Sequence, residues 1–504
     1  MHDDPGEHDH DGDDLYEQEE EHPLWKLDTI TLTSVGIDVG TATSQIIFSK
    51  LVLRRLGLEL SSRFVVVERT TLYRSPVWFT PYTPNRERID DDALGQLVAT
   101  AYADAGIAPD GVDTGAIILT GEAIRRDNAR AIADLFAERS GNFVCASAGH
   151  NFEALLAAHG SGAVALSAKR GCRVLNVDIG GGTTKLAVAE RGRVLGTAAL
   201  HVGGRLMATD EAGAITILEP GGQTLAAQAG LAWNLGDKPP AEEIERVAVH
   251  MASAILALIR DEKPAAEIAA LWLTEPLEGP KEYDAIVFSG GVGEYVYGQE
   301  PASFGDLGAA MGAALRARIA DGALSWPLEA AAERIRATVM GASQYTVQVS
   351  GNTLYRSADV LLPRKNLQVL RPDVDLSGDI DPEAVAARVL HHFRTFDLEE
   401  GEAEVALVFR WDGPPAAARI AAFCRGLIAG LPGTIKGGKP IYLVFDRDLG
   451  GLVGTILKDD FGLGNDILSI DGIELRDFDY IDLGTVLEPS GTVPVTVKSL
   501  VFQM

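Results

Sequence analysis

Two short stretches of this chain repeat one pattern, and the repeat limits the folds that the chain can adopt. In "GIDVGTATS" (36–44) and "VDIGGGTT" (177–184), an apolar run ends near an aspartate, glycines and threonines follow, and a second run begins. Glycine permits the positive φ of a tight hairpin turn without a steric cost. One such stretch predicts an ordinary β-hairpin. Two copies, with Asp38 and Asp178 140 positions apart, predict a duplicated domain.

The overall composition is that of a globular protein, and it argues against two classes of partner. The chain has 504 residues, 46% hydrophobic and 23% charged, and this length suits about two to four domains. A net charge of −28 is opposite to the basic footprint of a nucleic-acid-binding protein. No apolar run approaches the roughly 18 residues of a membrane span, and no secretory signal opens the chain. We therefore expect a cytoplasmic protein with neither nucleic-acid nor membrane partners.

The cysteines point to the same compartment. Cys145, Cys172 and Cys424 are far apart in the sequence and form no metal-ligand spacing. They are typical of reduced core thiols in a cytosolic protein.

The first 22 residues differ in composition from the rest of the chain. They contain eleven acidic residues and four histidines but neither lysine nor arginine. Such a segment buries too little apolar surface to offset the entropy lost on ordering, so we predict a disordered tail over 1–28. The histidines could alternatively bind a transition metal, although without a packed scaffold the solvated tail is the preferred interpretation.

The remaining chain reads as an α/β protein with three parts. Alternating strand and helix patterns predict a first lobe over 29–170, including a helix over 122–141. A second lobe is expected over 171–365, with an inserted subdomain at about 205–280. Polar, loop-forming residues around 371–384 place a boundary near 365–380. Two further strand–helix units predict a C-terminal α/β domain over 380–504.

Two facing hairpins of this kind can hold a polyphosphate. Backbone N–H groups without a neighbouring Cβ approach phosphate oxygens closely. Asp38 and Asp178 would then hold Mg²⁺ through its waters, because this ion prefers oxygen ligands and dehydrates reluctantly. A third cluster, "SGGVGE" (289–294), lies between a strand and a helix, as an adenosine-contact loop would. A dinucleotide-binding motif is the weaker interpretation, since its last glycine is missing.

These stretches together resemble the actin, hexokinase and heat-shock chaperone ATPase superfamily. The resemblance implies two actin-like (ribonuclease H-like) lobes around a cleft that binds ATP and Mg²⁺. It also implies that a helix at "NFEALLAAHGSG" carries the residue that orients the attacking water, which falls on Glu153, with His150 as the alternative. The implied catalytic residues are Glu153, Asp178 and Asp38, and the implied nucleotide contacts are Gly40, Thr41, Ala42, Thr43, Gly180, Gly181, Gly182, Thr183, Thr184, Gly290, Gly291, Val292 and Gly293.

A narrower resemblance runs from about residue 30 to the C-terminus. The stretches at 118–136, 148–163, 335–353 and 491–502 are similar to the ethanolamine utilisation family of ethanolamine ammonia-lyase reactivating factors. This resemblance implies a chaperone that exchanges damaged cobalamin in the inactivated lyase for adenosylcobalamin, using ATP and Mg²⁺. The base-off cobalamin motif Asp-x-His-x-x-Gly is absent, so we expect action on the lyase rather than storage of the cofactor. Association with a bacterial microcompartment stays open.

Two other functions fit the same superfamily. A small-molecule kinase would need a base beside the γ-phosphate, usually aspartate, and would not explain the C-terminal domain over 380–504. A filament-forming ATPase would have to pack closely despite the high net charge, although filaments do not require neutrality.

The tail carries a testable prediction. Deleting Met1–His22 should leave the melting temperature and ATP affinity unchanged, because the segment has no apolar face to pack. Melting curves of the intact and truncated chains, with and without Zn²⁺ or Ni²⁺, measure this. A melting temperature raised by metal in the intact chain alone would show a metal site instead.

Overall fold

The computed structural model describes residues 29–40, 42–55, 64–83, 88–120, 143–260, 269–332, 344–349, 355–357, 361–485 and 493–499. The predicted tail, Thr41 and the helix predicted over 122–141 lie outside these ranges. Within them, no helix is both long and apolar enough to cross a membrane. Cys424 is buried as expected, whereas Cys172 is only partly buried.

The first lobe is built on a sheet with the strand order β3-β2-β1-β5-β6. The pairs β1–β2 and β2–β3 are antiparallel, and the pairs β1–β5 and β5–β6 are parallel. Helix α3 (Asp91–Ala105) is capped by Asp90, which accepts the Ala93 N–H at 3.0 Å. The strands are β1 (Thr29–Val39), β2 (Thr43–Arg55), β3 (Phe64–Arg74), β4 (Trp78–Phe79), which pairs with β2, β5 (Thr114–Thr120) and β6 (Phe143–Ala148).

The second lobe repeats this topology. Its sheet has the order β9-β8-β7-β12-β13, with the same three antiparallel strands followed by two parallel ones. The duplication predicted from the two hairpins is therefore confirmed. Its elements are β7 (Arg173–Ile179), β8 (Thr184–Glu190), β9 (Arg193–Leu200), β10 (Met207–Thr209), β11 (Ile215–Leu218), α7 (Pro220–Gln228), α8 (Ala241–Ile259), β12 (Ala285–Ser289), α10 (Gly290–Val296), α11 (Gly308–Ala320) and β13 (Leu328–Glu329).

The third sheet has the order β14-β21-β20-β16-β17-β18-β19-β15, and β16 to β19 run parallel. Its helices include α13, which packs against α14. The elements are β14 (Gln344–Val349), β15 (Tyr355–Arg356), β16 (Arg364–Leu370), α13 (Pro382–Thr395), β17 (Val405–Phe409), α14 (Ala417–Gly430), α15 (Pro432–Lys436), β18 (Ile441–Phe445), α16 (Gly450–Thr455), the π-helix η4 (Ile456–Asp460), β19 (Ile467–Ile470), β20 (Asp479–Leu483) and β21 (Pro494–Ser499).

This third sheet begins earlier in the chain than the sequence indicates. The predicted domain start at 380 is too late, because β14 is hydrogen-bonded to β21, and β16 to both β17 and β20. The polar stretch at 371–384 connects β16 to α13 inside the domain instead of separating two domains. We propose a boundary after residue 332.

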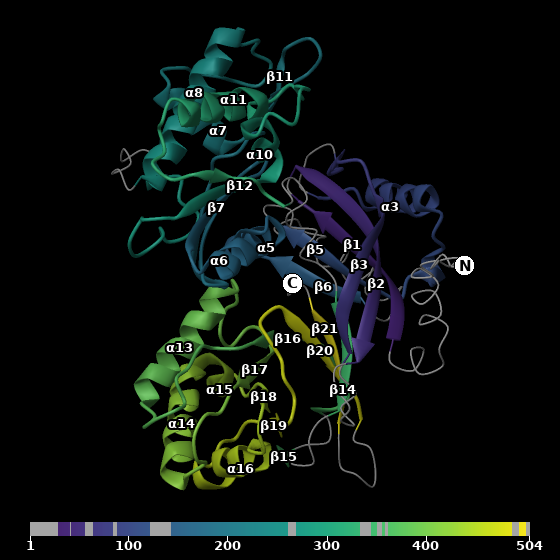
Figure 1. Ribbon diagram of the computed structural model, residues 1–504, viewed down its shortest axis with the longest axis vertical. Helices are drawn as coiled ribbons and strands as arrows, with labels where there is room; N and C mark the ends of the chain where they lie inside the picture. Colours follow the sequence, from purple (N-terminus) through teal and green to yellow (C-terminus); the bar gives the residue numbers. More distant parts are fainter. Residues whose placement is uncertain are drawn as a thin grey trace, which may run out of the picture.

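Helices α5 (His150–Gly160) and α6 (Ala163–Arg170) lie between the three sheets (Figure 1). Every residue of α5 from Phe152 to Ala158 is buried. One hydrophobic core joins Phe152, Leu155 and Leu156 of α5 to Ala116 and Ile118 of β5 and to the C-terminal domain. A helix segment that is buried on all sides belongs in such a core, so α5 connects the lobes to the C-terminal domain.

Candidate functional site

The two predicted phosphate turns have the same geometry. The N–H of Gly40 donates to the Thr43 carbonyl at 2.9 Å, and the N–H of Gly180 donates to the Thr183 carbonyl at 2.9 Å. Both aspartates precede their turns and are buried: Asp38 lies opposite Gln45, and Asp178 lies opposite Lys185.

The two turns also meet. A Cβ built on Gly181 would lie only 2.5 Å from the Cβ of Ala42, so only glycine fits at this contact. Within the described residues, the N–H groups of Gly181 and Gly182 have no hydrogen-bond partner. Adjacent free N–H groups of this kind form an anion-binding concavity.

The segment "GGR" at 203–205 is hydrogen-bonded to the backbone of the second turn. The N–H of Gly204 donates to the Gly180 carbonyl at 2.9 Å, and the N–H of Arg205 donates to the Gly181 carbonyl at 2.6 Å. A Cβ on Gly203 would overlap the Gly181 carbonyl. The Gly180 and Gly181 carbonyls are thus directed toward residues 204 and 205. The N–H groups of Gly181 and Gly182 are left as donors for an anionic ligand.

Asp178 is a buried carboxylate at the base of the second turn. Its Oδ1 accepts a hydrogen bond from Ser289 Oγ at 2.7 Å. Burial raises the pKa of Asp178, although Lys185 and the Ser289 hydrogen bond act in the opposite direction. The structure therefore brings the third predicted cluster, which begins at Ser289, against the second.

Glu153 lies near this turn but is not a free base. Its Oε1 forms an ion pair with the Nζ of Lys185, and both side chains are buried. The Lys185 Nζ lies 3.9 Å from the position of a Cβ on Gly180. His150 is the first residue of the same helix. Whether Glu153 orients water stays a prediction.

Sequence reasoning did not identify Lys185. The available signal was a single cation within the otherwise apolar strand "TTKLAV" (183–188). A buried lysine is rarely found without a partner, so this position could have indicated a nearby carboxylate.

The third cluster is the first turn of α10 rather than a loop. Gly290 has φ +78°, and a Cβ there would overlap the backbone of Ile179 at the end of β7. The Val292 side chain is 3% exposed and belongs to the core of the second lobe. The Val292 side chain is therefore not available to a ligand. Backbone contact of this turn with an adenosine stays a prediction for Gly290, Gly291, Val292 and Gly293.

A small cavity of about 60 Å³ lies where the two turns meet. Arg205 and Phe79 line it: the Arg205 Cζ lies 4.0 Å from the ring centroid of Phe79 in the first lobe, and the guanidinium pairs with Asp306 at 3.2 Å. Small-molecule sites usually measure about 300–1,000 Å³. The donor set suits a phosphate, but the cavity is smaller than a triphosphate needs.

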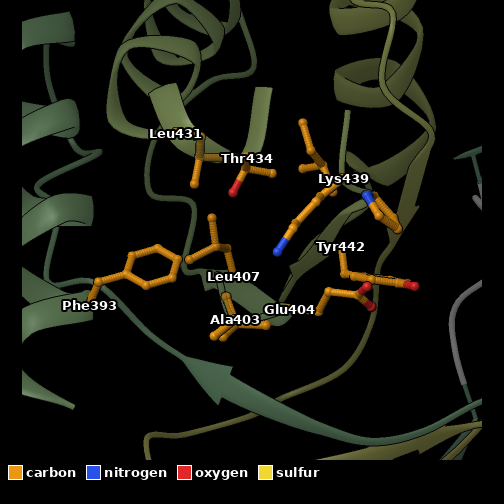
Figure 2. Close-up of a pocket in the computed structure, with 11 residues that line it drawn as sticks. Phe393, Ala403, Glu404, Leu407, Leu431, Thr434, Lys439 and Tyr442 are labelled. Atoms are coloured by element: carbon orange, nitrogen blue, oxygen red, sulfur yellow. The ribbon is translucent and has the colours of Figure 1, made fainter. Parts of the chain in front are cut away.

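A second cavity lies in the C-terminal domain, at the amino ends of β17 and β18 (Figure 2). Its volume of about 10 Å³ is close to that of one water molecule. Phe393 and Leu407 supply apolar walls, and Lys439 Nζ donates to the Glu402 carbonyl at 2.9 Å. We assign no ligand to it.

Two sheets of identical topology, with matched aspartate–glycine turns in contact, define a two-lobed actin-like ATPase fold to which an α/β domain is added. The chain belongs to the ethanolamine utilisation protein EutA family, whose family model matches residues 30–503. It is 35% identical over 499 residues to the ethanolamine ammonia-lyase reactivase EutA of Salmonella typhimurium, covering 94% of this chain and 100% of the relative. The Escherichia coli (strain K12) protein of the same name is also 35% identical, over 485 residues, with the same coverage.

One solved structure of an ethanolamine utilisation protein is a distant match. The ethanolamine utilization protein EutJ from Carboxydothermus hydrogenoformans is 14% identical, covers 62% of this chain and 88% of its own, and has a TM-score of 0.31. A TM-score this low does not support a fold assignment. The assignment depends instead on the strand order of the two sheets.

The environment of Asp178 leads to a prediction about pH. A carboxyl pKa raised by folding means that the native state binds the proton more tightly, so stability falls as pH rises through that pKa. Asp178→Asn should therefore melt at or above the parent at pH 7, and the difference should shrink in acid. Its Mg²⁺-dependent nucleotide affinity should fall about 10- to 100-fold, as for other outer-shell metal groups.

Asp375→Asn is the matched control. Hydrogen bonds from Ser377 lower the pKa of Asp375, so this variant should melt at or below the parent at pH 7. Thermal melts from pH 4 to 8 and calorimetric nucleotide titrations make the comparison. If Asp178→Asn melted well below the parent at pH 7, the buried charge would be stabilising and the account of Asp178 wrong.

Proposed function

We propose that this chain is an ATP-dependent reactivating factor for ethanolamine ammonia-lyase. The observation that carries the proposal is the extent of the match: two curated relatives named as reactivases of this lyase align over their entire length. The lobes and the C-terminal domain all fall within the matched region. The finer step that we propose is release of damaged cobalamin from the lyase, so that adenosylcobalamin can rebind, in the cytoplasm.

The residues that would hold the nucleotide come from both hairpins. The N–H groups of Gly181 and Gly182 would donate to phosphate oxygens, and Asp38 and Asp178 would hold Mg²⁺ through water. Among the described residues, no group of three or more His, Cys, Asp or Glu side chains could hold a metal ion. Phosphate and water oxygens would therefore complete the coordination, as is usual for Mg²⁺.

The contact between the turns suggests how nucleotide binding could change the arrangement of the two lobes. With Gly181 against Ala42 and Arg205 on Phe79, the cleft has no room for a triphosphate. Nucleotide binding and this arrangement therefore exclude one another, and binding shifts the population toward separated lobes. If the lyase binds one arrangement of the lobes more tightly than the other, it would be bound or released as ATP binds and is hydrolysed.

Glu153 and Lys185 would act together on the attacking water. In the described arrangement the Glu153 carboxylate is ion-paired with the Lys185 ammonium. Lys185 also lies beside Gly180, so its ammonium is placed to turn toward phosphate charge. That movement would leave the Glu153 carboxylate to accept a proton from water.

The test is a reactivation assay. Cyanocobalamin-inactivated lyase is incubated with the chain, ATP, Mg²⁺ and adenosylcobalamin, and deaminating activity is followed. We expect the parent to restore activity, and the double variant Glu153→Gln/Lys185→Gln to bind ATP but hydrolyse it about 10²- to 10⁴-fold more slowly. The double change keeps the buried pair neutral, because removing one partner alone would leave an uncompensated buried charge.

Two outcomes would contradict this account separately. If the parent restored lyase activity equally fast without any nucleotide, the function would not depend on ATP. Hydrolysis by the double variant at the parent's rate would show that Glu153 only packs the helix.

A further inference from the structure

The N-terminal turn of α5 lacks a cap of its own and receives one from another domain. Its N-cap residue, Gly149, has no side chain to accept a hydrogen bond. Asp397 of the C-terminal domain fills this role: its Oδ2 accepts the N–H of Phe152 at 2.9 Å, and its Oδ1 accepts from Asn151 Nδ2 at 2.9 Å. Phe152 is the third residue of the helix, where a capping side chain normally bonds.

The backbone on both sides is fitted to this contact. A Cβ on Gly149 would overlap the Asp397 side chain, so the glycine leaves the space that the carboxylate occupies. Asp397 itself has φ +54°, a conformation that aspartate tolerates better than most residues. Asp397 accepts a backbone cost and Gly149 leaves room for its carboxylate, so the contact is specific rather than incidental.

Neighbouring contacts strengthen the same junction. The Phe152 ring stacks on Phe478 at 5.4 Å between centroids and lies 5.5 Å from Phe396, the residue before Asp397. Asn151 Oδ1 accepts a hydrogen bond from Thr197 Oγ1 of β9 at 2.9 Å. The C-terminal domain, α5 and the second-lobe sheet therefore meet at two adjacent residues.

The residue after Phe152 is Glu153. We propose that Asp397 is a positioning residue for Glu153: by capping α5, the docked C-terminal domain fixes the Glu153–Lys185 pair beside the second phosphate turn. A reacting group misplaced by about 1 Å can lose about 100-fold in rate, so small movements of this helix turn matter. The inference depends on the proposed ATPase function for its kinetic consequence, but not for the structural link itself.

The kinetic test is a double-mutant cycle in the full-length chain. Asp397→Ala should lower kcat for ATP hydrolysis about 10- to 100-fold with ATP affinity within about twofold, and Asp397→Asn, which keeps an acceptor oxygen, should recover part of the rate. In the Glu153→Gln/Lys185→Gln background, Asp397→Ala should cause no further loss. The matched control is Asp373→Ala, which removes an exposed ion pair with Arg193 of β9 and leaves α5 untouched.

A second readout needs no nucleotide. Lysine acylation followed by mass spectrometry should find Lys185 protected in the parent and in Asp373→Ala, but several-fold more reactive in Asp397→Ala. If Lys185 stays protected, or if the kinetic losses simply add, Asp397 serves only to attach the domain and the proposal is wrong. If the parent hydrolyses no ATP but Lys185 becomes reactive, the proposed ATPase function fails while the structural link stands.

Discussion

Burial of helix α5 is the constraint on which the arrangement of this molecule depends. The helix lies among three sheets and is buried from Phe152 to Ala158, so the two lobes and the C-terminal domain each remove part of its surface from water. Glu153 lies within this run, and a carboxylate there must be compensated. Lys185 supplies the compensation from the second aspartate–glycine hairpin. The apolar packing and the ion pair thus tie the hairpin to the C-terminal domain through one helix.

The contact between the glycine turns defines the second constraint. Gly181 approaches Ala42 so closely that the two lobes are shut against one another, with Arg205 on Phe79 beside them. The contact leaves no room for a side chain at position 181, so it accounts for Gly181 independently of any ligand. Under the proposed function, the same positions would serve two arrangements, one with the turns in contact and one with a phosphate between them.

The sequence predicted what is local or repeated. Paired aspartate–glycine turns indicated the duplicated lobes because each turn is specified by adjacent residues, and the aspartates lie where the pattern placed them. Partners contributed from distant segments were missed: Lys185 opposite Glu153, Arg205 above Phe79, and Asp397 against Gly149. Each such contact depends on tertiary packing that no local spacing encodes.

The domain boundary was misplaced for a related reason. Polarity at 371–384 marks a loop, but a loop within a domain and a linker between domains have the same composition. Only the pairing of β14 with β21 and of β16 with β17 shows which of these it is. Val292 shows a different limit of sequence reasoning, since the side chain of a residue inside a predicted binding motif belongs to the core of the second lobe.

The central claim is that the two hairpins form one nucleotide site. Hydrogen–deuterium exchange of the full-length chain, with and without ATP and Mg²⁺, tests it most directly in peptides covering 38–45 and 178–185. The account predicts that exchange slows in both peptides together and at the same nucleotide concentration. Slower exchange in only one hairpin, or in neither while another region of the chain responds, would contradict it.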